Sequence, residues 1–558
     1  MLRTFALFAL LCAFYSSQAQ FQFPGDTIRI GELSYTVKPT GRNDFVSIND
    51  TIYTYTETSL VGGFASTGEL RISGQMYSFR ENFFPGPISS DPNSTSFYAR
   101  TWTVRKTMVD SFLQGYYFIP PIEIRSWPAH GRSQFGESYN LAPFVDANNN
   151  GYYDPMGGDY PLIKGDISTI ALFNDSTAGS IDTSGRRMHI EGYAMFFAFN
   201  PTSNLKNTLF KEVVLFNRSG QDYSDTYLSN FADMDCGWSP NDLIMTDVGR
   251  QALFAYDAYP VDSTQNGLYP KTPYSGTVLI QGPEADYFDG LDNDWDGCID
   301  GVLDSNGICI QEDSTNNIRE RIALSSTMSY INSFSPISGV PQTDLEVYYY
   351  LTGRFMDGTP IIIENPSGFL NPANGDGHVP GGSGPISNFI YPGNTVSPVS
   401  HLEPQSPTNW FQSPGGLEDV KGFISMGPFT WEDGEAISFI SATYAGRIDH
   451  QFHGNILDSI NAHIDGIRGI VTSGSLSSTE INQPKLRIRL GQSENQLHIH
   501  NDMSSPTTLY LKDLSGRELG QISVAGNGEK TYDVTHLPTG VYILQDISGD
   551  WVRKWVRF

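Results

Sequence analysis

Residues 51–55 read Thr-Ile-Tyr-Thr-Tyr, a short run of β-branched and aromatic side chains. Such enrichment, with alternation at a period of two, is typical of β-strands. Comparable runs recur along the chain, at residues 27–30, 34–37, 69–73, 193–199, 210–216, 277–280, 346–352 and 436–444. Strands at this spacing, cut by turns, favour sheets packed face to face. We therefore predict an all-β fold of sandwich-like sheets with one or few helices.

Two segments depart from the strand pattern. In residues 455–471 apolar side chains recur every three or four positions, at Ile456, Ile460, Ile464, Ile467 and Val471. This spacing predicts an amphipathic helix that lies on a sheet. Residues 365–414 are dense in Gly, Pro, Asn and Ser and show no periodicity, which indicates a long surface loop.

The composition limits the class of protein. A chain of 558 residues is too long for one continuous hydrophobic core. Lys and Arg number 34 against 61 Asp and Glu, a net charge of −27, yet 13% of the residues are aromatic. So many aromatic residues exclude intrinsic disorder. The acidity argues against nucleic acid as a partner, because phosphate contacts need clustered basic side chains.

The N-terminus predicts export. Arg3 is followed by an apolar run from Phe5 to Phe14 and by small residues that end at Ala19. This pattern indicates a signal peptide over residues 1–19, since the apolar run is shorter than the ~20 residues that span a bilayer. We expect no transmembrane segment in the rest of the chain. The exported chain keeps three cysteines, and the spacing of Cys298 and Cys309 permits a disulfide, although three free thiols fit the sequence equally well.

The first acidic loop runs from Asp146 to Asp159. Oxygen-bearing side chains fall at loop positions 1, 3, 5 and 9, and Gly151 at position 6 permits a sharp turn. Calcium takes six to eight oxygen ligands, which such a loop can supply together with the carbonyl at position 7. The candidate ligands are Asp146, Asn148, Asn150, Tyr152 through its carbonyl, Asp154 and Asp159. An Asn/Asp/Gly turn without metal is the alternative.

The second acidic loop is denser. Residues 289–313 hold eight acidic side chains and no basic one. Carboxylates ~5 Å apart repel each other by about 1 kcal/mol per pair in water, and a divalent cation removes that repulsion. The candidate ligands are Asp289, Asp292, Asp294, Asp296, Asp300 and Asp304. Oxygen ligands without histidine favour structural calcium over zinc, and a solvated acidic loop is the alternative.

Residues 289–300 resemble the aspartate-rich metal-binding motif D-G-x-D-N-D-x-D-G-x-x-D and, more loosely, thrombospondin type 3 calcium repeats. The resemblance implies bound calcium in this stretch.

No catalytic motif stands out. The chain has no zinc-protease H-E-x-x-H, no G-x-S-x-G elbow and no phosphate-binding glycine loop. We name no catalytic residue and lean against an enzyme. Carboxylate pairs for glycoside hydrolysis depend on the fold rather than on sequence spacing, so a carbohydrate-binding or carbohydrate-hydrolysing module is the alternative function.

Residues 481–558 predict a small immunoglobulin-like β sandwich of about seven strands. Three of its stretches, residues 511–517, 534–542 and 553–557, resemble the type A sorting domain of the Bacteroidota type IX secretion system. The Pro-Asn-Pro common near the start of that domain is absent. The residues that carry the sorting resemblance are Gly516, Arg517, Leu537, Pro538, Gly540, Val541 and Tyr542.

That resemblance implies a location and a partner. Domains of this family direct folded cargo through the type IX secretion machinery across the outer membrane, and are removed as the cargo is released or attached to surface polysaccharide. The expected place of the protein is therefore extracellular or on the outer-membrane surface of a Gram-negative bacterium.

The body resembles a family as well. Residues 59–64, 83–87, 127–131, 141–144, 158–161 and 163–166 resemble a recurrent family of large exported Bacteroidota proteins that carry this tail. That family implies location and architecture rather than chemistry. We divide the chain into a signal peptide (1–19), three β-rich regions (20–140, 141–330, 331–480) and the sorting domain (481–558). We expect a structural or adhesive role, with glycans as further partners.

Overall fold

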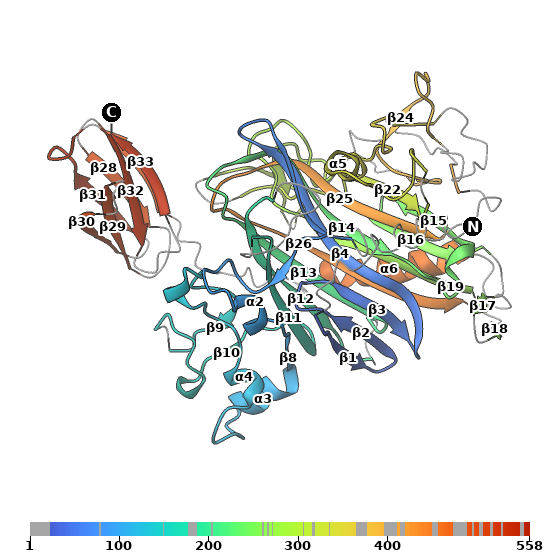
Figure 1. Cartoon of the computed structure of the whole chain (residues 1–558), viewed down its shortest axis with the longest axis horizontal. Coiled ribbons are helices and arrows are strands. Elements are labelled where there is room, and N and C mark those ends of the chain that lie inside the picture. Colours follow the sequence, from blue (N-terminus) through green and yellow to red (C-terminus); the bar gives the residue numbers. More distant parts are fainter. Residues whose placement is uncertain are drawn as a thin grey trace, which may run out of the picture.

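The computed structural model in Figure 1 describes most of the chain from Phe23 onward. Within that part it leaves out residues 77–79, 149, 177–186, 202–204, 259–261, 265–266, 270–271, 305, 315–317, 334, 364–376, 396–409, 413–418, 449–455, 473–487, 494–495, 502–505, 514–516, 526–527, 539, 547–551 and 558. The predicted signal peptide and much of the predicted loop at 365–414 therefore lie outside the described residues.

The body is built on two antiparallel sheets of nine strands each. In the first sheet the order is β1-β2-β3-β4-β14-β25-β22, with β5 on β4 and β6 on β5. Its strands are β1 (Asp26–Ile30), β2 (Leu33–Val37), β3 (Asn43–Ile48), β4 (Thr51–Ala65), β5 (Leu70–Met76), β6 (Arg80–Glu81), β14 (Tyr223–Asp233), β22 (Ser326–Ile331) and β25 (Val420–Trp431).

The second sheet has the order β15-β16-β19-β26-β13-β12-β11, and both β7 and β8 pair with β11. Its strands are β7 (Phe84–Pro85), β8 (Trp102–Arg105), β11 (Ile167–Asn174), β12 (Ile190–Ala198), β13 (Thr208–Asn217), β15 (Asp242–Asp247), β16 (Ala252–Asp257), β19 (Thr272–Gln281) and β26 (Ala436–Ile448).

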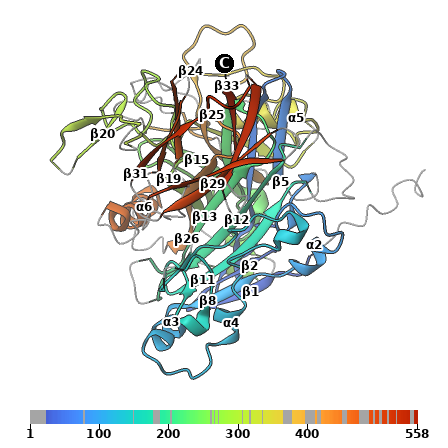
Figure 2. The same ribbon diagram turned by 90° about the vertical axis from the view of Figure 1, so that its left-hand side faces the viewer.

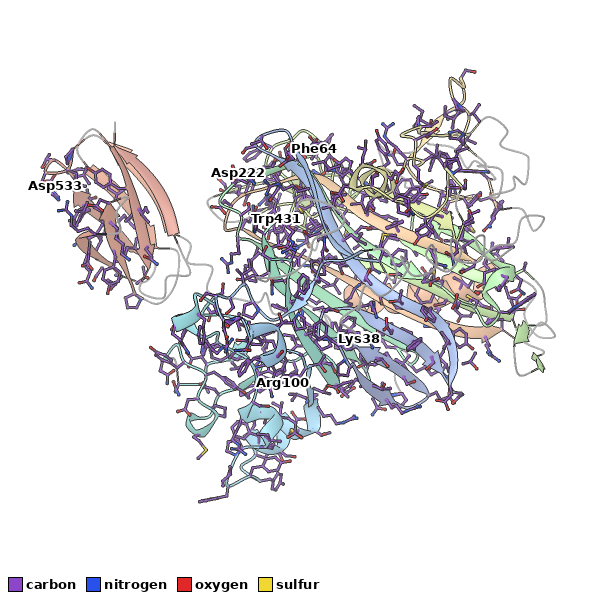
Figure 3. All side chains as sticks on the ribbon, in the orientation of Figure 1. Lys38, Phe64, Arg100, Asp222, Trp431 and Asp533 are labelled. Atoms are coloured by element: carbon purple, nitrogen blue, oxygen red, sulfur yellow. A yellow bond between two sulfur atoms is a disulfide. The ribbon has the colours of Figure 1, made fainter. Side chains whose placement is uncertain are left out.

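The largest core cluster lies between the two sheets. It joins Leu60 and Phe231 of the first sheet to Phe196 and Leu253 of the second. Side chains fill this space in Figure 3, where Phe64 marks β4 and Trp431 marks β25, the two strands that flank β14 in the first sheet. The burial of alternate apolar residues from both sheets is what makes a sandwich stable. The predicted all-β, sandwich-like fold is confirmed.

The three β-rich regions of the body belong to this one sandwich. Strand β14 pairs with β4 on one side and with β25 on the other, so that regions 141–330, 20–140 and 331–480 meet at one strand. Their register brings Asn230 opposite both Ser59 and Ile424.

A second core cluster covers the outer face of the second sheet. The helix predicted at 455–471 is present as α6 (Ile456–Thr472), and Ile460, Ile464 and Ile467 pack there with Phe254 and Tyr444. The same cluster includes Trp127 and Leu141, from the segment that carries α2 (Ser94–Phe97), α3 (Lys106–Leu113), α4 (Ile122–Arg125), η1 (Ser133–Phe135) and the two-stranded ribbon of β9 (Phe144–Val145) and β10 (Tyr160–Pro161).

The prediction of a strand at residues 346–352 is wrong, because this segment forms helix α5 (Asp344–Leu351). Thr343 caps the helix: its hydroxyl accepts a hydrogen bond from the Glu346 backbone N–H, and the Glu346 carboxylate accepts one from the Thr343 N–H. This reciprocal capping box overrides the strand preference of the Val and Tyr residues that follow. Val347, Tyr350 and Leu351 are buried in the core of the first sheet.

The remaining body elements are short. They are η2 (Pro155–Gly157), η3 (Ser239–Asn241), β17 (Asp262–Thr264) with β18 (Gly267–Tyr269), β20 (Gly301–Leu303) with β21 (Cys309–Gln311), and β23 (Ile361–Ile362) with β24 (Ile386–Ser387). None of the helices in the described part of the chain has the length and hydropathy that crossing a bilayer requires.

The C-terminal module has a core of its own. Seven strands form a three-stranded and a four-stranded sheet, which bury Leu497 and Ile499 of one sheet against Leu509, Leu511 and Leu544 of the other. The strands are β27 (Ile488–Ser493), β28 (Gln496–Asn501), β29 (Thr507–Asp513), β30 (Glu518–Val524), β31 (Gly528–Asp533), β32 (Gly540–Asp546) and β33 (Val552–Arg557). The predicted small sandwich is confirmed, and none of its described strands pairs with a body strand.

Candidate metal centres

The 292 loop, which we define as Asp292–Asp300, lies between β19 and β20. Carboxylate oxygens of Asp292, Asp294 and Asp296 lie within 4.8 Å of one another. The three residues alternate along the loop, and their carboxylates converge. A group of this kind can hold a metal ion.

Hydrogen bonds to the loop's own backbone hold these carboxylates in place. Asp292 accepts from the N–H groups of Asp296 (3.1 Å) and Gly297 (3.0 Å). Asp294 accepts from Asp296 N–H at 3.1 Å, and Asp296 from Cys298 N–H at 2.8 Å. Gly297 has φ +92°, a left-handed conformation that glycine adopts without strain. The loop's own backbone thus holds the three side chains in place.

Burial and mutual repulsion raise the pKa values of Asp292 and Asp294. Burial, followed by the charge of Asp296, raises the pKa of Asp294 to about 7. Burial also raises the pKa of Asp292, against the backbone hydrogen bonds that lower it. A bound divalent cation would offset both effects, because it favours the ionised carboxylates.

Glu320 is a neighbour that the sequence did not reveal. It is buried, and its carboxylate accepts from the backbone N–H groups of Asn293 (2.9 Å), which stands between Asp292 and Asp294, and of Gly301 (2.8 Å). Its charge contributes to the raised pKa of Asp294. Glu320 lies outside the spacing of the loop motif, so only the fold could connect it with this centre.

The other predicted ligands of this stretch, Asp289, Asp300 and Asp304, stabilise turns by accepting backbone hydrogen bonds. Asp289 accepts from Leu291 N–H, and Asp300 accepts from Gly290 N–H. Asp304 accepts from the N–H groups of Asn306 (2.8 Å) and Ile308 (2.9 Å) within the β20–β21 hairpin. These three residues are not members of the close acidic group.

The Cys298–Cys309 disulfide is formed, with the two Cα atoms 5.4 Å apart. It ties the 292 loop to strand β21 of the hairpin, which projects from the body in Figure 2. Cys236 is a buried free thiol. Of the two alternatives that the cysteine spacing left open, the disulfide is therefore confirmed.

The 146 loop, Asp146–Asp159, repeats the hydrogen bonding of the 292 loop position by position. Asp146 accepts from the N–H groups of Asn150 (3.1 Å) and Gly151 (2.8 Å), as Asp292 does from Asp296 and Gly297. The remaining equivalent bonds are Asn150 N–H to Asn148 and Tyr152 N–H to Asn150. Gly151, at φ +79°, matches Gly297. The two loops therefore share one pattern of backbone hydrogen bonds. They differ in charge, because Asn148 and Asn150 stand where the 292 loop has Asp294 and Asp296.

Asp159 and Asp154 close the 146 loop. The buried carboxylate of Asp159 accepts from the N–H groups of Ala147 (2.9 Å) and Asp154 (2.7 Å). Asp154 accepts from Met156 N–H at 3.1 Å, as the cap of η2. Because positions 3 and 5 are Asn148 and Asn150, the described residues of this loop form no close group of three acidic side chains.

A second close acidic group among the described residues, which the sequence did not predict, consists of Asp233, Asp235 and Asp419. The buried Lys421 Nζ lies 3.2 Å from Asp233 Oδ1 and 2.6 Å from Asp419 Oδ1. Lys421 is the cross-strand neighbour of Asp233 in the β14–β25 ladder. A lysine therefore supplies positive charge to this acidic group.

The predicted sorting residues lie partly inside the described structure. Leu537 and Tyr542 are buried in the C-terminal core, and the Tyr542 hydroxyl donates to the Pro538 carbonyl at 2.6 Å. Arg517 pairs with Asp513 at 3.1 Å. Gly540 and Val541 begin β32, and Gly516 lies outside the described residues.

No protein-family model matches the chain, and a search of curated proteins finds no match.

Proposed function

We propose that this chain is an exported surface protein with a structural or adhesive role, whose 292 loop is stiffened by bound calcium. The observation that carries the proposal is the close group of Asp292, Asp294 and Asp296, in a loop that the Cys298–Cys309 disulfide ties to the neighbouring hairpin. Disulfides persist in oxidising compartments outside the cytoplasm, which supports export.

Calcium fits this centre better than the other common metals. All donors in the group are carboxylate oxygens, which are hard ligands and suit calcium or magnesium rather than zinc. The two nearby cysteines are bonded to each other and supply no thiolate. Calcium accepts a flexible coordination shell, whereas magnesium demands a near-ideal octahedron. We assign the ion a structural role.

The 146 loop is proposed as a second, weaker calcium site. Its backbone matches the 292 loop, but amides replace two of the carboxylates. Calcium affinity falls as the ligand charge falls, so the 292 loop should fill first.

The test is the melting temperature of the protein with millimolar calcium and with chelator. Binding to the folded state alone stabilises it by about 2.7 kcal/mol when the free ion exceeds its dissociation constant a hundredfold. We expect a higher melting temperature in calcium and a smaller increase in Asp294→Asn. Asp50→Asn is the matched control, because Asp50 is an exposed carboxylate paired with Arg29 on β1. An unchanged melting temperature at millimolar calcium would contradict the metal site.

We further propose that residues 486–558 sort the protein through the type IX secretion machinery, with surface polysaccharide as the attachment partner. The separate core of this module supports the proposal, because a sorting signal must act independently of its cargo. After deletion of residues 486–558, the protein should be retained in the periplasm of the producing bacterium. Normal export of the shortened chain would contradict the sorting role.

A carbohydrate-active function is the second candidate. The cleft beside α3 includes Tyr160 and Phe199 with two carboxylates, Asp110 and Asp166. However, Asp110 is paired with Lys106 at 2.7 Å, and Asp166 accepts from Asn200 N–H at 2.7 Å. Release of reducing sugar in a polysaccharide-hydrolysis screen, lost in Asp166→Asn, would favour this second function.

A further inference from the structure

The loop that joins α3 to α4 exposes an unusual amount of apolar surface. Phe118 is 97% exposed and Tyr116 75% exposed. The loop projects from the lower end of the body in both views (Figures 1 and 2). We call this surface the aromatic loop and define it by its six exposed apolar side chains: Leu113, Tyr116, Tyr117, Phe118, Ile119 and Ile122.

The size of this surface separates it from ordinary exposed residues. With about 150–250 Å² for a large side chain, the exposed fractions of the six residues amount to roughly 700 Å². The largest apolar patch on a typical monomer covers about 300–600 Å². A stable protein interface buries about 800 Å² on each partner. The aromatic loop therefore exposes nearly the area that one side of an interface needs.

A cleft of about 440 Å³ adjoins the aromatic loop. Its apolar wall comes from α3, from the β9–β10 ribbon and from the end of β12, and includes Val109, Leu113, Val145, Leu162 and Phe199. Leu113 belongs to both the loop and the cleft. An apolar protrusion and an apolar recess thus stand side by side on one surface.

The charge around this surface permits contact between two copies. Residues 100–125 carry four basic and two acidic side chains, in a chain whose net charge is −27. At the rim, Lys106 is paired with Asp110, and Arg125 donates to the Pro120 carbonyl at 2.9 Å. Repulsion between two acidic copies is therefore reduced when they meet through this end.

We propose that the aromatic loop of one copy inserts into the cleft of a second copy of this chain. Because the loop and the cleft are neighbours, a two-fold axis through this surface lets both copies insert at once. Such an interface is self-complementary and closes as a dimer. Phe118, the most exposed of the six side chains, is the residue that enters the partner's cleft.

The test is the mass of the purified protein in solution, by sedimentation and light scattering over a range of concentrations. We expect a dimer that dissociates on dilution, and a monomer for both Phe118→Ser and Leu162→Asp, which alter the loop and the cleft respectively. Phe288→Ser is the matched control, because Phe288 is 60% exposed but lies beside the 292 loop. It should dimerise as the unchanged protein does.

A mixture of the two variants separates loss of contact from loss of folding. A mixed pair retains one unaltered loop facing one unaltered cleft, so Phe118→Ser with Leu162→Asp should form mixed dimers that neither forms alone. The proposal is overturned if the unchanged protein stays monomeric over a 100-fold range of protein concentration. It is equally overturned if Phe118→Ser dimerises as the unchanged protein does, or if the two variants form no mixed dimer. It is also overturned if Phe118 is protected from solvent by neutral lipid vesicles or by polysaccharide instead of by a second copy.

Discussion

Lys211 and Glu57 form an ion pair inside the sandwich, where both side chains are buried. Lys211 Nζ lies 3.1 Å from Glu57 Oε1, and the Glu57 carboxylate also accepts from Asn230 Nδ2 (2.9 Å) and the Thr443 hydroxyl (2.7 Å). The four residues come from β13, β4, β14 and β26, two strands from each sheet. Burial lowers the pKa of Lys211, and the charge of Glu57 opposes that shift. This network crosses the interface between the sheets.

Removal of the lysine alone should be costly. Lys211→Met leaves the Glu57 carboxylate buried without a cation, and breaking a buried pair in this way costs about 3–5 kcal/mol. The free energy of unfolding in urea measures the loss. The double variant Lys211→Met with Glu57→Gln should recover much of it, since no charge then remains buried. Equal stability of the single variant and the unchanged chain would show that the pair contributes nothing.

Asp235 makes the stability of the folded protein depend on pH. Burial first, then the charges of Asp233 and Asp419, raises its pKa to about 8, whereas in the unfolded chain it titrates near the usual 3.8. A carboxyl whose pKa is raised on folding stabilises the protein while it is protonated. That contribution is complete below pH 4 and is lost as the pH rises through 8.

Asp235→Asn should therefore stabilise the protein increasingly as the pH rises. The amide resembles the protonated acid and does not titrate. We expect the difference in melting temperature between variant and unchanged protein to grow from pH 4 to pH 8 and to stay constant above. The readout is a series of thermal scans of both proteins in the same buffers. A difference that is independent of pH would contradict the raised pKa.

At the scale of single elements, α5 shows where sequence patterns fail. The run Glu346 to Thr352 is rich in Val and Tyr and satisfies the strand criteria, yet Thr343 and Glu346 cap it as a helix. The Thr-x-x-Glu spacing was present in the sequence and predicts a helix start. By contrast, α6 has five aliphatic residues at helical spacing and no competing signal, and its prediction is confirmed.

The cap of α5 is open to a direct test. Thr343→Ala removes the hydroxyl that accepts from the Glu346 N–H, and loss of such a cap costs about 1 kcal/mol. Faster amide hydrogen exchange over residues 344–351, with little change in the distant β11, is the expected result. Thr343→Ser keeps a hydroxyl and serves as the control. Equal rates of amide hydrogen exchange in the Ala and Ser variants would show that the Thr343 hydroxyl does not stabilise α5.

The acidic loops show how far local spacing predicts a site. The spacing predicted six aspartate ligands in this stretch, and three of them, Asp292, Asp294 and Asp296, lie in one close group. The spacing could not place Glu320, which reaches the loop because the chain returns to it just before β22. Nor could it reveal that Lys421 lies between Asp233 and Asp419, since this depends on the pairing of β14 with β25.

For the molecule as a whole, the sequence predicts the class of fold but not its connections. Strand patterns identify half-buried segments one by one, whereas pairing depends on contacts between residues far apart in the chain. Glu57 and Thr443 hydrogen-bond although 386 positions separate them. The C-terminal module was easier to delimit, because all seven of its strands pair within residues 488–557.

That local pairing predicts two separate unfolding units. The body buries its core between its two large sheets, and the module buries Leu509, Leu511 and Leu544 within its own. We expect a chain that ends at residue 480 to keep the main calorimetric transition of the full protein, at the same temperature within a degree or two. A smaller transition, from the module, should disappear.

The calorimetry also decides how the export test is interpreted. If the shortened chain keeps the main transition, its retention in the periplasm reflects the loss of a sorting signal. If the main transition is lowered by many degrees, the module stabilises the body, and retention would follow from misfolding alone. The described strands favour the first outcome, because none of the ladders joins the module to the body.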